Sequence, residues 1–334
     1  MDKEVLSANP EGKILAIGEL LVDLIPAREQ MRIEDTGPVL KTASGSAGIF
    51  ACAAARLGAP VGFIGKVGRD PLSRMVTFAI QKENVDTQCL AVSDEGQIGL
   101  AFLEYTENGR NYQYYRTDSV GSRLCAGDLK DSCFAKAFAV HFPGMLLELN
   151  ESMRGACLRA AELAKKYGVA LSFDPNIRQE MIRDEQARKR LMDMVSRADI
   201  IAPTLEEGRK ITGKNSLGDV LRALRALGPR VIALTMDRDG AALCVGEKVI
   251  LADAASVQEA DPTGAGDTFA AALCVGLREG MEPKRLAMFC NTAGALAVTK
   301  RGAIGTALPS RAEVDEMMQA NPCRIRETTL PQIG

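Results

Sequence analysis

The 334-residue chain has no tryptophan and a single histidine, His141. One histidine excludes any zinc site that needs two or more imidazoles, and a catalytic histidine would have to be this residue. His141 ends a short apolar run before Pro143 and Gly144, and no nucleophile motif accompanies it. We therefore expect His141 to pack at the end of a strand rather than to take part in chemistry.

The chain also lacks a long apolar run and a strong net charge. No segment approaches the ~20 apolar residues of a membrane helix, and residues 1–11 are polar and acidic rather than signal-like. The formal net charge of −2 offers no basic footprint for nucleic acid or for an anionic membrane surface. We expect a cytoplasmic protein that binds neither.

The sequence also contains no two cysteines at the spacing that is typical of a metal-binding or redox site. The nine cysteines are an odd number and contain no Cys-x-x-Cys. Four of them, Cys52, Cys244, Cys274 and Cys290, lie in apolar runs. We expect the cysteines to be reduced core residues.

Short apolar runs alternate with helical segments over most of the chain, and a hydrophobic content of 46% is ample for a core. This alternation predicts an α/β fold, a doubly wound and mostly parallel sheet flanked by helices, whose ligands bind at the carboxyl ends of the strands. Expected strands cover 13–18, 61–67, 89–93, 138–142, 169–173, 199–202, 231–235, 241–245 and 249–252; expected helices cover 49–57, 70–84, 128–136, 151–167, 184–197, 205–211, 217–227, 265–277 and 283–299.

Two successive extended runs, 98–106 and 111–116, interrupt the alternation. Asn108 and Gly109 between them are a hairpin signal. With the polar, irregular segment 28–44, this hairpin predicts a small β-sheet lid. The expected division is therefore a lid of 28–44 and 98–116 and a core domain of 1–27, 45–97 and 117–334.

Residues 261–269, DPTGAGDTF, are the most informative stretch, and we call them the signature segment. Gly264, Ala265 and Gly266 carry little side chain, so successive backbone amides can face one anion at the positive end of the expected helix. Asp267 beside them suits a base that takes a proton from a hydroxyl attacking phosphorus. For an isolated Gly-x-Gly-Asp, the alternative is a turn in which Asp267 caps the helix.

Further polar groups interrupt or follow the expected strands. Asp23 lies in an apolar segment, so it is either hydrogen-bonded locally or faces a ligand. Residues 174–178 suit polyphosphate, metal-bound water or an acidic substrate, with an Asp-Pro turn as the alternative. Thr204 and Glu207 match a capping box, which explains them without a ligand, whereas Glu207 acting through water on Mg²⁺ is the functional alternative. Residues 235–240 suit a nucleotide edge and, equally, a plain turn.

The signature segment matches that of the ribokinase/PfkB-type carbohydrate kinases almost letter for letter. The resemblance extends over about 13–310, through Gly18-Glu19 and residues 55–58, 65–70, 173–176 and 291–295. It implies a ribokinase-like α/β core with a β-lid, ATP as donor, Mg²⁺, often K⁺, and phosphorylation of a sugar hydroxyl. It assigns Asp267 as catalytic base; Gly264, Ala265 and Gly266 as anion hole; Asp261 and Thr263 to a monovalent-cation site; Glu207 to Mg²⁺ through water; Asn176, Thr235, Asp237, Gly240 and Asn291 to the nucleotide; and Asp23, Gly45, Arg116 and Arg178 to the substrate.

Two positions depart from the family pattern. Thr204 replaces the asparagine of Asn-x-x-Glu, and Ile49 replaces the asparagine of the sugar-binding Gly-Gly-x-x-x-Asn segment. Residues 18–26 look like those of fructokinases, and residues 114–116 with 174–178 are shared by fructokinases and 2-keto-3-deoxygluconate kinases. For an acid sugar, Arg116 and Arg178 would be natural partners of the substrate carboxylate.

The sequence therefore predicts an ATP-dependent kinase of a fructose-like ketose or of a 2-keto-3-deoxygluconate-like sugar acid. The alternatives are a nucleoside kinase, which should bind an aromatic base, and a non-catalytic sugar-binding regulator on the same fold. In the carbohydrate-kinase family that the chain resembles, an exposed lid edge often pairs with another copy, so the resemblance also implies a homodimer through the lid.

Overall fold

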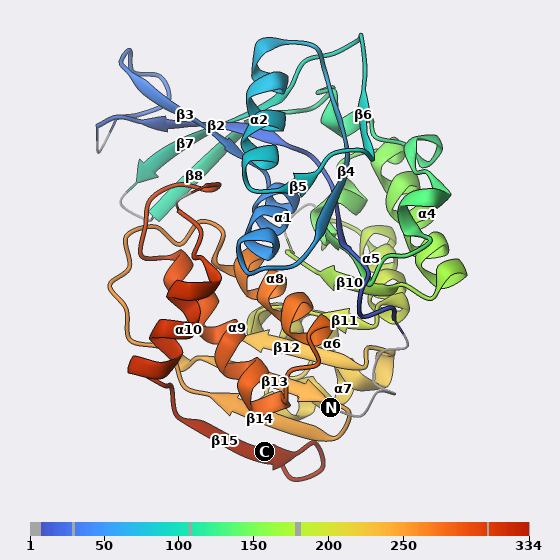
Figure 1. Ribbon diagram of the computed structural model, residues 1–334, viewed down its shortest axis with the longest axis vertical. Helices are drawn as coiled ribbons and strands as arrows, with labels where there is room; N and C mark the ends of the chain where they lie inside the picture. Colours follow the sequence, from blue (N-terminus) through green and yellow to red (C-terminus); the bar gives the residue numbers. More distant parts are fainter. Residues whose placement is uncertain (1–7, 29–30, 107–108, 178–181, 306, 334) are drawn as a thin grey trace.

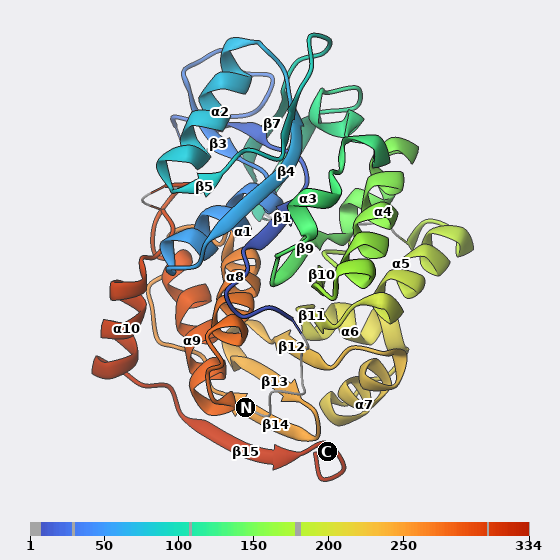
Figure 2. The same ribbon diagram turned by 45° about the vertical axis from the view of Figure 1, so that its right-hand side comes forward.

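Figure 1 presents a computed structural model that describes residues 8–28, 31–106, 109–177, 182–305 and 307–333. A large sheet runs through the molecule with helices on both faces, and a smaller sheet stands beyond one end of it (Figures 1 and 2). The helices are α1 Ser46–Arg56, α2 Pro71–Lys82, α3 Asp131–Phe134, α4 Glu151–Tyr167, α5 Glu185–Arg197, α6 Leu205–Thr212, α7 Leu217–Leu227, α8 Ala265–Arg278, α9 Pro283–Ala297 and α10 Arg311–Ala320.

The large sheet has the strand order β15-β14-β13-β12-β11-β10-β9-β1-β4-β5, with β6 also paired to β4. Pairing is parallel from β12 through to β5 and β6, and antiparallel from β12 to β15. The predicted mostly parallel α/β fold is confirmed. Its strands are β1 Ile14–Ile17, β4 Val61–Val67, β5 Val85–Asp86, β6 Leu90–Val92, β9 Ala139–Pro143, β10 Ala170–Asp174, β11 Ile200–Ile201, β12 Val231–Thr235, β13 Ala241–Val245, β14 Lys248–Ala252 and β15 Ile325–Thr329.

The position of strand β1 in the sheet explains why its sequence is apolar at successive residues rather than at alternate ones. Ile14 and Ala16 belong to the core cluster shared with α1, α8 and α9, whereas Leu15 and Ile17 belong to the cluster shared with α4, α5 and α7. These two sets of helices cover opposite faces of the sheet (Figures 1 and 2). A central strand must therefore be apolar on both faces.

His141 lies in β9 and is fully buried, which confirms the predicted packing role. Its Nδ1 is 2.9 Å from Ser172 Oγ, and its ring stacks on Phe50 of α1 with centroids 3.8 Å apart. Burial lowers the pKa of His141 to about 3, so the ring is neutral at physiological pH.

The smaller sheet has the order β3-β2-β7-β8, made by β2 Leu21–Pro26, β3 Val39–Ser44, β7 Gly99–Thr106 and β8 Gly109–Tyr115. The predicted hairpin is confirmed as the antiparallel pair β7 and β8; its turn residues, 107–108, lie outside the described residues. Strand β2 pairs with β3 and β7, so the sheet includes a segment that we had expected in the core. Its apolar first half, buried at Leu21 and Val22, is what made it look like core sequence.

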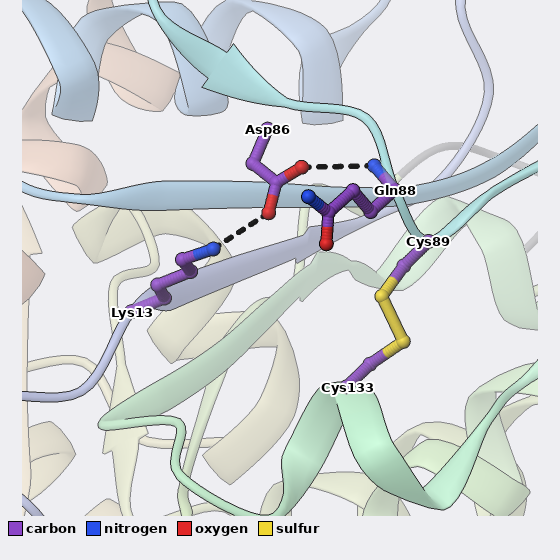
Figure 3. Close-up of a disulfide and its surroundings, with 5 residues drawn as sticks. All are labelled: Lys13, Asp86, Gln88, Cys89 and Cys133. Atoms are coloured by element: carbon purple, nitrogen blue, oxygen red, sulfur yellow. Dashed lines mark hydrogen bonds and ion pairs between the residues drawn. A yellow bond between two sulfur atoms is a disulfide. The ribbon is translucent and has the colours of Figure 1, made fainter.

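The cysteine prediction is wrong for one pair. Cys89, between β5 and β6, and Cys133, in α3, form a disulfide with their Cα atoms 6.5 Å apart (Figure 3). Both are partly exposed, so neither is a core residue, and their separation of 44 residues gives no local motif. The four cysteines in apolar runs are buried and free, as predicted.

Among the described residues, no helix has the length and apolar character needed to cross a membrane.

Candidate active site

Helices α1 and α8 begin beside each other below the lid sheet (Figure 1), and a glycine precedes each of them. Gly45 has φ 106° and Gly264 has φ 79°, values that side chains other than glycine rarely adopt. A Cβ on Gly45 would lie 2.5 Å from the carbonyl oxygen of Glu19, and a Cβ on Gly264 would lie 2.9 Å from Cγ2 of Ile49. Both helix starts therefore depend on glycine for their close packing.

Asp267 occupies the third position of α8, where the helix dipole favours a negative charge. The hydroxyl of Ser46, the first residue of α1, donates to Asp267 Oδ1 at 2.5 Å. The predicted base thus sits where two helix N-termini meet, held by a serine from the other helix.

A cavity of about 280 Å³ lies between the lid sheet and these two helix starts. On the lid side Tyr112 OH is 3.2 Å from Thr263 Oγ1, which links β8 to the signature segment. The cavity brings together seven residues predicted from the sequence: Asp23, Gly45, Arg116, Asn176, Thr263, Gly264 and Asp267.

Asp23 lies on β2 at the lid side of this cavity and is 5% exposed. Burial raises the pKa of Asp23 to about 6, and the nearby Asp261 carboxylate adds to the rise, whereas a hydrogen bond with Ser44 opposes it. The structure therefore combines the two alternatives for Asp23, since the side chain is hydrogen-bonded locally and also lines the cavity.

Arg116, just after β8, pairs with a carboxylate that the sequence analysis did not assign. Its Nη1 lies 3.1 Å from Glu19 Oε2, and its guanidinium stacks over the Tyr114 ring at 4.4 Å. Burial raises the pKa of Glu19, while Arg116 and the Ser119 hydroxyl, which donates at 3.2 Å, favour its ionised form. The negative charge of Glu19, which does not line the cavity, therefore compensates the positive charge of Arg116.

Glu207 forms the predicted capping box at the start of α6. Its Oε2 accepts from the Thr204 amide at 2.8 Å, and the Thr204 hydroxyl accepts from the Glu207 amide at 3.1 Å. In addition, Glu207 Oε1 accepts from the Ile177 amide at 2.6 Å. Glu207 therefore ties the loop after β10, which contains Asn176, to α6. The predicted Arg178 lies outside the described residues.

Asp261 is buried at the start of the signature segment and is held by backbone amides. Its Oδ1 accepts from Thr263 N at 2.8 Å, and its Oδ2 accepts from Gly302 N at 3.3 Å. These bonds fasten the segment to the loop that follows α9.

The residues predicted for the nucleotide fall in two places. Thr235, Asp237 and Gly240 lie at the end of β12 and in the turn after it. Asn291 on α9 donates to the Asp253 carbonyl at 2.8 Å, whereas Asn176 lines the lid-side cavity instead. A second cavity, of about 540 Å³, adjoins the β12 turn and is lined by Leu217, Met236, Arg238, Asp239, Leu251, Ala252, Asp253, Ala254 and Arg326.

Within the described parts of the chain, no group of three or more His, Cys, Asp or Glu side chains is placed to hold a metal ion.

The sequence profile of the pfkB family carbohydrate kinases matches residues 11–311. The chain belongs to this family. Fructokinase-1 of Zea mays is 30% identical to it over 316 residues, which are 92% of this chain and 97% of the maize protein. This pfkB-family kinase is a phosphotransferase acting on a sugar hydroxyl, as the signature segment predicted.

Solved structures confirm the ribokinase-like fold with its separate small sheet. An E. coli protein described as a ribokinase II, in complex with ATP and Mg²⁺, has a TM-score of 0.87 at 26% identity, with 93% of this kinase and 100% of that chain covered. A fructokinase of Vibrio cholerae O395 with fructose, ADP and calcium has a TM-score of 0.79 at 26% identity, with 92% and 99% covered.

Two side chains at the site of this kinase had no assigned role in the sequence analysis. Ser46 is 221 residues from Asp267 along the chain, and no motif joins the two positions. Glu19 had been noted only as part of a family motif, although a charged residue two positions after a buried strand such as β1 is itself a signal for a buried ion pair.

Proposed function

We propose that this pfkB-family kinase transfers the γ-phosphate of ATP to a hydroxyl of a small neutral ketose such as fructose. The observation that supports it most is the cavity of about 280 Å³ with the Asp267 carboxylate in its wall, next to the N-terminus of α8. This volume suits a small sugar, and the wall offers both a proton acceptor and a place for developing negative charge.

In this proposal Asp267 accepts the proton of the acceptor hydroxyl as that oxygen attacks phosphorus. The backbone amides of Gly264, Ala265 and Gly266 form the anion hole, where the positive end of α8 favours negative charge. A Cβ built on Gly266 meets no atom within 4 Å, so there is open space for a phosphate at the start of the helix.

The charged groups around the site are compatible with an Mg²⁺ ion that is bound mainly by the phosphates of ATP. We assign Glu207 to act on it through water, because both Glu207 oxygens already accept backbone amides. The ion would neutralise phosphate charge during transfer. We assign Asp261 and Thr263 to a K⁺ site, and the nucleotide to Asn176, Thr235, Asp237, Gly240 and Asn291.

The charges that line the cavity favour a neutral sugar. Asp23 and Asp267 would both repel a substrate carboxylate, and the one described cation in the lining, Arg116, is already paired with the buried Glu19. The relatives support the same choice, since the maize protein is a fructokinase and the Vibrio structure contains fructose.

The position of Arg116 in the lining also supports a second candidate, a 2-keto-3-deoxygluconate-like acid. Arg116, together with the predicted partner Arg178, would then bind the substrate carboxylate. The further alternatives are a nucleoside kinase and a non-catalytic sugar-binding regulator. Turnover with each substrate distinguishes these alternatives from a sugar kinase.

A coupled ADP-release assay with fructose, 2-keto-3-deoxygluconate and adenosine tests the proposal. We expect turnover with fructose at a kcat/KM at least tenfold above that with the acid, roughly the discrimination of one unfavourable charge contact. Preference for the acid or for adenosine would reject the neutral ketose. Thermal stabilisation by fructose without ADP release would indicate the regulator.

We also propose that two copies pair through their lids. Val39 and Leu40 on the edge strand β3 are 42% and 62% exposed, and an apolar edge strand favours pairing with another chain. Light scattering of the wild type and of Leu40→Lys should give a dimer and a monomer, respectively; a monomeric wild type would contradict the pairing.

A further inference from the structure

The hydrogen bond between Ser46 and Asp267 joins the first turns of two helices that are far apart in the sequence. Ser46 Oγ lies 2.5 Å from Asp267 Oδ1 across 221 residues of chain. We infer that Ser46 is a positioning residue, which fixes the orientation of the Asp267 carboxylate toward the acceptor hydroxyl. The inference rests on the proposed role of Asp267 as base.

A hydrogen-bond partner matters for Asp267 because the carboxylate of an aspartate rotates readily about its last bond. The final torsion of an aspartate is broad and has no sharply preferred staggered position. A base must nevertheless present its oxygen within a few tenths of an ångström of the proton that it accepts. A hydroxyl that donates to a carboxylate makes a strong, short hydrogen bond and so limits this rotation.

Ser46 is itself firmly placed. Gly45 before it packs against the Glu19 carbonyl, and Ile49 and Phe50, the next turn of α1, are almost fully buried. Phe50 in turn stacks on the buried His141 of β9. The chain from the sheet through α1 to Ser46 is thus a rigid support for the hydroxyl.

The Ser46 hydroxyl is not explained as a helix cap. Helix α1 begins after Gly45 with no side-chain cap hydrogen bond, and Ser46 is its first residue rather than its N-cap. In contrast, the starts of α4, α6 and α10 are capped by the side chains of Asn150, Thr204 and Ser310. The hydroxyl of Ser46 is directed to the base instead.

The two side chains also share the cavity wall. Ser46 and Asp267 both line it, together with Gly45 and Gly264, the residues that precede their helices. A sugar in the cavity would therefore meet a carboxylate whose orientation is set from the side by α1.

The test is steady-state kinetics of Ser46→Ala and Ser46→Thr with fructose and ATP. We expect Ser46→Ala to lower kcat about tenfold or more while leaving the KM for ATP within about twofold, because a misplaced base slows the chemical step and not nucleotide binding. Ser46→Thr keeps the hydroxyl and should restore kcat to within about threefold of the wild type. Ser152→Ala, at the start of α4 and away from the cavity, is the matched control and should behave as the wild type.

A double mutant separates positioning from direct sugar binding. If Ser46 acts through Asp267, Ser46→Ala should cause no further loss in an Asp267→Asn background. A wild-type kcat in Ser46→Ala, a rise in sugar KM alone, or failure of threonine to restore activity would each overturn the inference. If the wild type itself releases no ADP with any sugar, the proposed function fails as well, which is a distinct result from a fully active Ser46→Ala.

Discussion

The two walls of the sugar-sized cavity hold their charged groups in different ways. On the core wall, Asp267 is presented by a helix N-terminus and a serine hydroxyl, and it is partly exposed. On the lid wall, Asp23 and the pair of Glu19 and Arg116 are largely buried, and burial raises the pKa of both acids. In the proposed mechanism, the core wall holds the base at a fixed point, whereas the lid wall determines which charges the sugar meets.

The largest effect should come from the core wall. We expect Asp267→Asn to lower kcat by about 10²–10⁴, since an amide cannot accept the proton, while the affinity for ATP changes little. ADP release and isothermal titration with a non-hydrolysable ATP analogue measure the two quantities. A variant with normal turnover would remove Asp267 from the mechanism.

On the lid wall, Arg116→Ala should act on stability as well as on substrate binding. Removing the guanidinium leaves Glu19 buried without its ion-pair partner, which should lower the free energy of unfolding by about 2–3 kcal/mol, below the range for a fully buried pair because Arg116 retains some exposure. Urea unfolding measures the change. Adding Glu19→Gln should recover part of it, and an absence of recovery would mean that the pair is not what stabilises the lid wall.

Asp23 gives the smallest predicted effect, and it depends on pH. The folded pKa of about 6 lies above the reference value of 3.8, so the folded state holds the proton more tightly. This group therefore makes the free energy of unfolding fall as the pH rises from about 4 to about 6. At pH 7 Asp23→Asn should be more stable than the wild type by about 1–2 kcal/mol.

Urea unfolding of the wild type and Asp23→Asn at pH 4 to 7 tests the Asp23 prediction. His141, whose folded pKa of about 3 is below its reference value of 6.5, acts in the opposite direction and lowers stability as the pH falls below about 6.5. Because both proteins contain His141, the difference between them isolates Asp23. An equal pH dependence in the two would show that Asp23 ionises normally.

Contiguous features could be read from the sequence. Helices α4 and α7 and strands β4, β12 and β13 have the predicted bounds, because each is an apolar or amphipathic run with clear end signals. The signature segment indicated the family for the same reason, since its residues are contiguous in the sequence. Helix α10 was missed although Ser310 and Glu313 form a readable capping box.

Features made by distant residues could not be read in this way. Strand β15, IRETT, is a partly exposed edge strand without apolar alternation, so it carries no strand signal of its own. The contacts of Ser46 with Asp267 and of Glu19 with Arg116 span 221 and 97 residues, and only the tertiary fold brings them together. The disulfide between Cys89 and Cys133 likewise joins residues that only the tertiary fold brings together.

That disulfide has a topological consequence for the lid. Cys89 precedes β7 and Cys133 follows β8, so the bond closes a covalent ring that contains the whole hairpin and Arg116. Near the bond, Asp86 accepts from Lys13 Nζ at 2.6 Å and from Gln88 N at 2.9 Å, which fastens the loop before Cys89 to the core. A protease that cuts the hairpin once would open the ring without separating the chain, so the two fragments would part on a gel only after reduction.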